Sequence, residues 1–166
     1  MLSKVLSFAL CVLSAVQVSP NPIGSSNANV LARQNPVAVK IVNVGNGGST
    51  FTFTGSTSLE VLIQQGVVDR DGAVWEKYMI GADKYTFKNA ETGYWISVGG
   101  EGHLFTDSSV NATVFAVESA GGGEFVIKAP YADQVWQTFY DGTSPIYLRV
   151  VMQPADGGSD QRWTFV

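Results

Sequence analysis

The chain has 166 residues, of which 45% are hydrophobic and only 14% are charged. This apolar content is enough for the core of one modest domain and argues against an intrinsically disordered protein. The formal net charge is −4, and no lysine- or arginine-rich stripe is present to neutralise phosphates, which argues against nucleic acid and anionic membranes as partners. The 18 glycines and the scattered aromatic residues favour short strands and tight turns over long helices.

The N-terminus has the pattern of a secretory signal peptide. Met1–Lys4 is short and positively charged, and Val5–Val16 is apolar with small residues near its end. This apolar run is shorter than the roughly 18 residues that a membrane-spanning helix needs, and no other stretch comes close. A buried N-terminal helix is the alternative, but Pro20 and Pro22 follow at once. We therefore predict a signal peptide at residues 1–18, a secreted extracellular protein and no membrane span.

The next segment, residues 19–36, is polar, contains several prolines and shows no periodicity. It is predicted to be a disordered leader or a propeptide with Arg33 as the cleavage point, and an uncleaved flexible tail explains it equally well. Loss of residues 1–34 would remove Lys4 and Arg33 but no acid, so the net charge would fall from −4 to −6. The only cysteine, Cys11, lies in the predicted signal peptide, so the remaining domain must be stable without a disulfide.

Three weak repeats occupy residues 37–166. Each begins with a short stretch of alternating apolar and polar residues, followed by a turn signal rich in glycine, proline, asparagine or aspartate. The first residues of these stretches are Val39, Tyr85 and Phe125. The aromatic residues that close the repeats are Trp75, Phe115 and Trp163. The repeats are about forty residues long and span about 37–81, 82–122 and 123–166.

Three units of strands and turns can pack together in few ways. A propeller needs at least about four blades, and a solenoid of three units would still need caps. A closed barrel with threefold pseudosymmetry removes free strand edges and brings one closing aromatic from each unit into a shared core. The sequence therefore predicts an all-β protein with the β-trefoil fold and with Trp75, Phe115 and Trp163 in its core. An immunoglobulin-like sandwich is the second interpretation.

Two motifs resemble those of a known family. Gln161-Arg162-Trp163-Thr164-Phe165 carries the Gln-x-Trp signature that closes repeats in ricin-B-like lectins, and Tyr85–Tyr94 resembles the opening of such repeats, with an asparagine followed by a Thr-Gly turn. Together with the leader, residues 37–166 resemble secreted fungal ricin-B-like β-trefoil proteins, among them the fucosylated-chitobiose-binding lectins of inky-cap mushrooms. The resemblance implies a non-catalytic carbohydrate-binding protein whose partner is a glycan or glycoprotein.

The sequence departs from this family in ways that affect function. The closing motif has Ala73 in the first repeat and Thr113 in the second where the family has glutamine, and the places where the family usually has a sugar-binding aspartate hold Ser97 and either Gln137 or Thr138. The resemblance therefore implies a lectin that uses a different surface. Related mushroom trefoils, similar to cospins and mycocypins, inhibit proteases through exposed loops, and Gly142–Pro145 could be such a loop. A protease is thus the alternative partner.

Catalytic and metal-binding motifs are scarce. His103 is the only histidine and the one cysteine lies in the predicted signal peptide, so Ser-His-Asp and Cys-His mechanisms have few residues to draw on, and zinc sites that need three or four histidine or cysteine ligands are excluded. A pair of carboxylates could still form a glycosidase site, but fourteen acids in a small domain yield close pairs by chance. Asp69–Gly72 superficially resembles the start of a calcium loop and is better explained as a turn. We expect no enzyme activity, no metal and no cofactor.

Candidate sugar-binding residues combine aromatic rings, which stack on sugar C–H faces, with polar groups that bond hydroxyls. Two groups fit, one in the second repeat and one in the third. They are Tyr94, Trp95 and His103, and Tyr131, Asp133, Trp136, Tyr140 and Asp141. Trp136 and Tyr140 could instead face the barrel, whereas Tyr94 and Trp95 cannot both do so because neighbours on a strand alternate sides. Asn111 begins a sequon for N-glycosylation.

Overall fold

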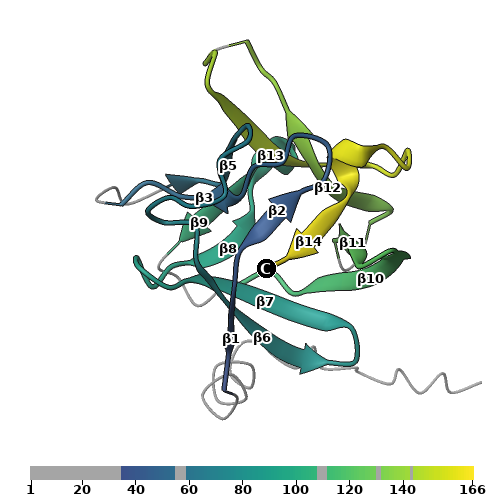
Figure 1. The fold of residues 1–166 in the computed structure, drawn as a ribbon. Helices are drawn as coiled ribbons and strands as arrows, with labels where there is room; N and C mark the ends of the chain where they lie inside the picture. Colours follow the sequence, from purple (N-terminus) through teal and green to yellow (C-terminus); the bar gives the residue numbers. More distant parts are fainter. Residues whose placement is uncertain (1–34, 55–58, 108–111, 130–131, 143) are drawn as a thin grey trace, which may run out of the picture.

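The computed structural model describes residues 35–54, 59–107, 112–129, 132–142 and 144–166. The predicted signal peptide, most of the predicted leader, Asn111 and Tyr131 lie outside these ranges. The described residues form short strands and two 3₁₀ turns (Figure 1), which confirms the all-β class. The strands are β1 (Val37–Val39), β2 (Ile41–Asn43), β3 (Thr50–Phe51), β4 (Leu59–Glu60), β5 (Leu62–Gln64), β6 (Trp75–Gly81), β7 (Lys84–Asn89), β8 (Trp95–Val98), β9 (Leu104–Asp107), β10 (Phe115–Gly121), β11 (Glu124–Lys128), β12 (Gln134–Phe139), β13 (Tyr147–Pro154) and β14 (Trp163–Phe165). The turns are η1 (Gly100–Gly102) and η2 (Ser159–Gln161).

Each repeat joins its own first and last strands in an antiparallel pair. β1 pairs with β6 in the first repeat, β7 with β10 in the second, and β11 with β14 in the third. In all three pairs the residue that opens the repeat lies opposite the aromatic that closes it. These partners are Val39 and Trp75, Tyr85 and Phe115, and Phe125 and Trp163. The shared register gives the molecule its threefold pseudosymmetry.

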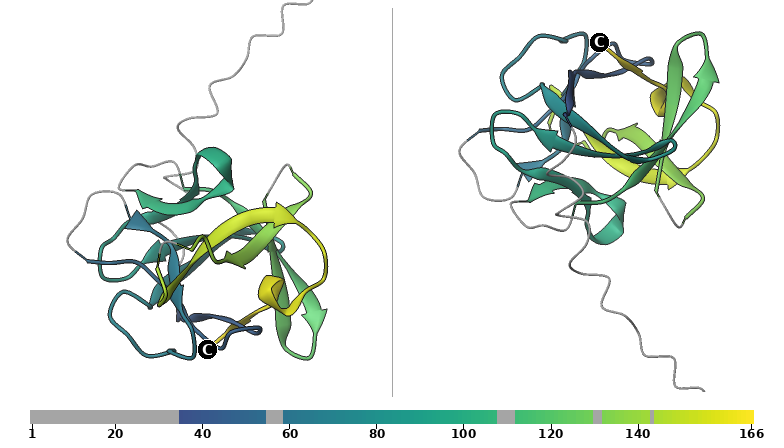
Figure 2. Two further views of the ribbon diagram at one scale, coloured as in Figure 1. Left: turned by 90° about the horizontal axis from the view of Figure 1, so that it is seen from above. Right: turned by 90° about the horizontal axis from the view of Figure 1, so that it is seen from below.

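The last strand of each repeat also pairs with the first strands of the next repeat. β6 pairs with β7 and β10 with β11, while β14 pairs with β2 and so joins the end of the chain to its beginning. Figure 1 shows β14 beside β2, and Figure 2 shows the strands wrapped around a common centre. Within the repeats, β3–β5, β8–β9 and β12–β13 form further antiparallel pairs. This closure leaves few strand edges unpaired.

The centre of the barrel is filled by aromatic rings. The closing aromatics Trp75, Phe115 and Trp163 are fully buried in one core cluster. Trp136 is also fully buried, and its ring centroid lies 5.1 Å from that of Phe115 and 5.8 Å from that of Trp163, edge-on in both cases. The indole N–H of Trp163 donates to the backbone oxygen of Trp136 at 3.1 Å. Trp136 is therefore a core residue, and its ring is not accessible to a ligand at the surface.

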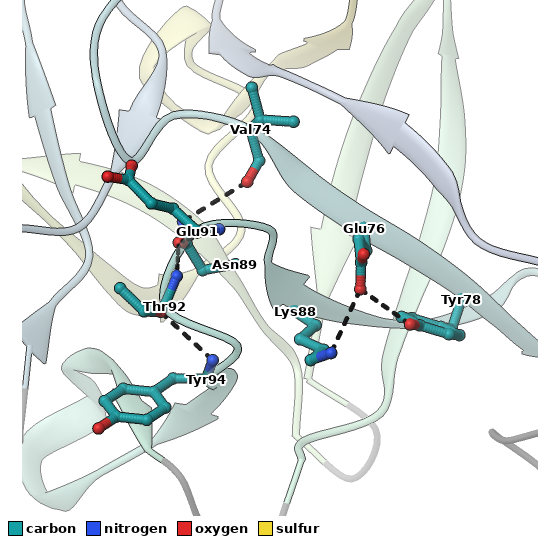
Figure 3. Close-up of polar contacts among 8 residues, drawn as sticks. All are labelled: Val74, Glu76, Tyr78, Lys88, Asn89, Glu91, Thr92 and Tyr94. Carbon is teal, nitrogen blue, oxygen red and sulfur yellow. Dashed lines mark hydrogen bonds and ion pairs between the residues drawn. The ribbon is translucent and has the colours of Figure 1, made fainter. Parts of the chain in front are cut away.

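A buried asparagine links the first repeat to the second. Asn89 Nδ2 donates to the carbonyl oxygen of Gly72 at 2.8 Å, three residues before the closing aromatic of the first repeat. Asn89 Oδ1 accepts the backbone N–H groups of Glu91 and Thr92 at 3.1 and 3.0 Å (Figure 3). The side chain thus fixes the turn that opens the second repeat and ties that turn to the end of the first. The opening motif that resembles a lectin repeat has a structural role here.

Asn43 makes the same contacts where the third repeat meets the first. Its Nδ2 donates to the carbonyl oxygens of Asp160 and Arg162 at 2.9 and 3.1 Å, and its Oδ1 accepts the N–H groups of Gly45 and Asn46 at 3.1 and 3.2 Å. Both asparagines are fully buried. Because buried polar groups are costly unless they are hydrogen-bonded, these side chains stabilise the fold only through this complete set of partners.

The third junction lacks the contact, because alanine occupies position 129. The next residue is Pro130, which has no N–H and cannot donate to Val114 as Ala90 N donates to the carbonyl of Val74 at 3.0 Å. The β10–β11 ladder accordingly ends one pair earlier than the β6–β7 ladder, which reaches Trp75 and Asn89. A groove of about 530 Å³ lies at this junction. It is lined by Lys84, Ala112, Thr113, Val114, Ala116, Glu118, Lys128 and Ala129.

We expect Asn89→Ala to lower the free energy of unfolding by about 1–3 kcal/mol, because it leaves buried backbone groups without partners. Urea unfolding followed by tryptophan fluorescence measures the change. Asn35→Ala, at an exposed position, serves as the matched control and should leave the midpoint unchanged. Equal midpoints for Asn89→Ala and the unsubstituted protein would show that the link between repeats does not stabilise the fold.

Candidate functional site

Polar and aromatic side chains form one row across four strands: β6, the last strand of the first repeat, and β7, β8 and β9 of the second repeat. Glu76 on β6 lies opposite Lys88 on β7, Lys88 lies opposite Trp95 on β8, and Trp95 lies opposite Asp107 on β9. Cross-strand partners share a face of the sheet, and Tyr78, two residues after Glu76, lies on that face too. Because Trp75 faces the core, this face points away from it.

Four members of this row contact one another. Tyr78 Oη donates to Glu76 Oε2 at 2.8 Å, and Lys88 Nζ lies 3.5 Å from the same oxygen (Figure 3). The ring centroids of Tyr78 and Trp95 are 5.1 Å apart, and Lys88 Nζ lies 5.8 Å from the centroid of the Trp95 ring. We call Glu76, Tyr78, Lys88 and Trp95 the Trp95 cluster.

The Trp95 cluster is partly exposed to solvent, yet its side chains are held in place by their neighbours. The side chains of Glu76 and Lys88 are each 30% exposed, and the two aromatic residues are half-buried. Their packing and hydrogen bonds hold the rings in place, so little side-chain freedom remains to be lost on binding. The cluster offers two adjacent rings, a carboxylate that accepts hydrogen bonds and an ammonium that donates them. This combination suits a ligand with both C–H faces and hydroxyl groups.

The environment of Tyr78 favours its neutral phenol over the phenolate. Partial burial, the hydrogen bond to Glu76 and the negative charge of that carboxylate all disfavour the phenolate, and they raise the pKa of Tyr78 to about 12. The hydroxyl therefore remains a donor to Glu76 at any pH below this value. This donor helps to fix the carboxylate beside Lys88.

Tyr94 does not join the Trp95 cluster. It lies in the turn before β8, half-buried, where its N–H donates to Thr92 Oγ1 at 3.3 Å and its carbonyl accepts the N–H of Asn89 at 2.8 Å. Figure 3 shows its ring on the other side of this turn from Tyr78. His103 follows η1 and forms an isolated bridge with Val151. Trp95 is thus the one predicted residue of the second repeat that belongs to the cluster.

The predicted residues of the third repeat lie elsewhere. Asp133 and Tyr140 flank β12, which pairs with β11 and β13 and not with the strands of the Trp95 cluster. Tyr140 is 57% exposed, whereas the carboxylate of Asp141 forms an ion pair with Arg149 Nε at 2.9 Å. With Trp136 in the core, the described residues of this group supply no aromatic–polar surface comparable to the Trp95 cluster.

The glutamine of the Gln-x-Trp motif is structural. Gln161 is almost fully buried, its Oε1 accepts the N–H of Asp156 at 2.9 Å, and its Nε2 donates to Gln137 Oε1 at 3.0 Å. Gln137 Nε2 in turn donates to Asp160 Oδ2 at 2.6 Å. Gln137, one of the two residues expected from the sequence at the family's aspartate position, is therefore an amide that already has partners on the loop before β14.

A second group of aromatic residues packs around Phe51, in a small cluster separate from the main core. The rings of Phe51, Phe53 and Tyr147 meet edge to face, with centroids 5.3 to 5.6 Å apart. The Arg70 guanidinium lies 3.4 Å from the centroid of Phe51, and its Nη1 donates to Gln64 Oε1 at 2.8 Å. Since Arg70 covers the Phe51 face and Tyr147 belongs to β13, this group joins the first repeat to the third through aromatic and cation–π packing.

Glu76, Tyr78 and Lys88 were not singled out from the sequence. Alternation along β6 could have placed Glu76 and Tyr78 on the face opposite Trp75. No sequence signal shows, however, that β7 lies between β6 and β8 and so brings Trp95 onto the same face as these two residues. Among the described residues, no three histidine, cysteine, aspartate or glutamate side chains are grouped to hold a metal ion. The described part of the chain also contains no helix long and apolar enough to cross a membrane.

Comparisons with known proteins establish the fold. No protein family profile and no curated protein matches the chain. The designed threefold-symmetric protein ThreeFoil matches with a TM-score of 0.67 and 16% identity, over 78% of this chain and 97% of its own. The ricin B-like lectin of Macrolepiota procera, solved with lactose, matches with a TM-score of 0.63 and 16% identity, over 80% and 96% of the two chains.

A Polyporus squamosus lectin bound to a sialylated epitope matches with a TM-score of 0.62 and 20% identity, over 80% of this chain and 49% of its own. A galactanase and several toxins also match, so the similarity does not define one activity. At these identities it shows the fold alone. The protein is a β-trefoil, as the three repeats predict, and its structural neighbours include ricin B-like lectins.

The raised pKa of Tyr78 predicts a phenol that ionises near pH 12, visible in an ultraviolet titration at high pH and absent from Tyr78→Phe. The folded-state value lies above the ordinary value of 10, so the stabilising contribution is complete below pH 10 and is lost as the pH rises toward 12. Tyr140→Phe, at an exposed position, should retain this late phase. A titration in which Tyr78→Phe keeps it would contradict the assignment.

Proposed function

We propose that this protein is a secreted, non-catalytic carbohydrate-binding protein that holds its glycan at the Trp95 cluster. The observation that carries the proposal is the half-exposed pair of rings, Trp95 and Tyr78, beside the carboxylate and ammonium of Glu76 and Lys88. The predicted signal peptide supports secretion.

The geometry of the cluster matches the chemistry of a sugar ring. One face of a pyranose is rich in C–H bonds and packs on an indole, while the hydroxyls at its edge need donors and acceptors. Trp95 supplies the indole, Lys88 on the adjacent strand β7 supplies the donor, and Glu76 on the next strand, β6, supplies the acceptor. All three positions are on β-strands, whose backbone hydrogen bonds keep the spacing fixed.

A single shallow site of this kind binds weakly. Its dissociation constant is expected near the millimolar range, about −4 kcal/mol. Useful avidity therefore requires a multivalent glycan surface or several copies of the protein. The structural similarity to lectins solved with lactose and with a sialylated epitope supports a carbohydrate ligand without identifying which one.

Binding to a dense glycan array tests the proposal. Trp95→Ala is expected to weaken binding about tenfold or more, because it removes the stacking surface. Tyr140→Ala, which removes an exposed ring outside the cluster, should bind as the unsubstituted protein does. Trp95→Phe should retain part of the affinity, since it keeps an aromatic face.

A protease inhibitor remains the alternative, acting through the loop that contains Pro145. A panel of trypsin-like, subtilisin-like and papain-like proteases separates the two functions. Inhibition at micromolar protein together with an empty glycan array would favour the inhibitor. Glycan binding that survives Trp95→Ala but is lost in Tyr140→Ala would keep the function and move the site to the third repeat.

A further inference from the structure

One end of the barrel contains a lysine at a position that is otherwise apolar. Two residues after each closing aromatic, the strand again faces the interior. These positions are Lys77, Val117 and Phe165. Val117 is buried in the core cluster and Phe165 packs against it. The first repeat thus places a positive charge where its two pseudosymmetric counterparts place apolar side chains.

The Lys77 ammonium is surrounded by aromatic rings and not by acids. Its Nζ lies 4.3 Å from the ring centroid of Phe165 and 5.1 Å from that of Tyr85. Among the described residues, Lys40, Lys88 and Lys128 each form an ion pair with a carboxylate, whereas Lys77 and the exposed Lys84 form none. Burial also lowers the pKa of Lys77, as expected for an ammonium that has lost water without gaining a counterion.

The ammonium lines a pocket of about 400 Å³. Its other lining residues are Asn35, Val37, Met79 and Tyr85. Val37 and Met79 are 58% and 52% exposed, so apolar surface is open to solvent beside the charge. Figure 1 shows that β1, β6, β7 and the C-terminus meet at this end of the barrel. The pocket therefore combines one unpaired cation with apolar walls.

We propose that this pocket binds an apolar carboxylic acid, with its carboxylate on Lys77 and its hydrocarbon part against Val37 and Met79. An unpaired, partly desolvated ammonium gains more from a bound carboxylate than an exposed lysine does, because less water has to be displaced from it. A neutral ligand would leave that charge uncompensated, and a cationic ligand would be repelled. The charge thus selects an anion, and the walls select an apolar one.

This site is separate from the Trp95 cluster. Lys77 lies between Glu76 and Tyr78 on β6, and adjacent residues of a strand point to opposite faces. A ligand on Lys77 therefore lies on the barrel side of the strand, and a glycan would lie on the other. Glycan binding at the Trp95 cluster and carboxylic acid binding at Lys77 can therefore be tested independently.

Titration of the ¹⁵N-labelled protein with decanoate, followed by NMR, tests the inference. We expect saturable shifts in β1, β6, β7 and β14, and none there with decyltrimethylammonium at the same concentration. Lys77→Met should weaken decanoate binding about tenfold or more, whereas Lys77→Arg should restore most of it. Lys84→Met, at an exposed lysine outside the pocket, is the matched control and should bind decanoate normally.

Lys77→Met should fold, because the two equivalent positions of the barrel already hold apolar residues, and its spectrum shows directly whether it does. Equal decanoate binding by Lys77→Met and by the unsubstituted protein would overturn the inference. Equal shifts with decanoate and decyltrimethylammonium, or decanoate shifts confined to other strands, would overturn it as well.

Discussion

One register governs the architecture: the closing aromatic of each repeat lies opposite the first residue of the same repeat. This pairing sends Trp75 into the core, and strand alternation then decides where its neighbours point. Glu76 must face outward and Lys77 must face the barrel interior. The candidate glycan surface and the apolar pocket are thus two sides of one strand, and a shift by a single residue would exchange them.

The three junctions between repeats are not equally strong. Asn89 and Asn43 each bridge two chain segments that are distant in sequence, whereas the third junction has Ala129 and a proline in place of the corresponding donors. Stability within a protein is uneven, and segments with fewer backbone bonds open more readily. The start of β10 and the end of β11 should therefore open locally at a lower cost in free energy than the two junctions that contain a buried asparagine.

The sequence predicts the fold well because strand alternation and repeat spacing are local signals. It left Trp136 undecided, since a core ring and a sugar-stacking ring have the same chemistry and only packing separates them. The contribution of Asn89 to the stability of the fold could not be predicted for a different reason. Its sequence motif indicates only a turn, and its contact with Gly72 forms only when β6 and β7 pair in the observed register. The Trp95 cluster depends in the same way on the alignment of three strands.

The pairing of β14 with β2 has a consequence for chain connectivity. Lys40 and Val166 exchange backbone hydrogen bonds at 2.7 and 3.1 Å, so the last residue lies next to the first strands of the domain. The start of β1 and the last residue therefore lie near each other on the barrel. A short linker could join Val166 to β1, and new ends could be opened at the turn between β6 and β7, which would give a circular permutant of the barrel that keeps the described strand pairs.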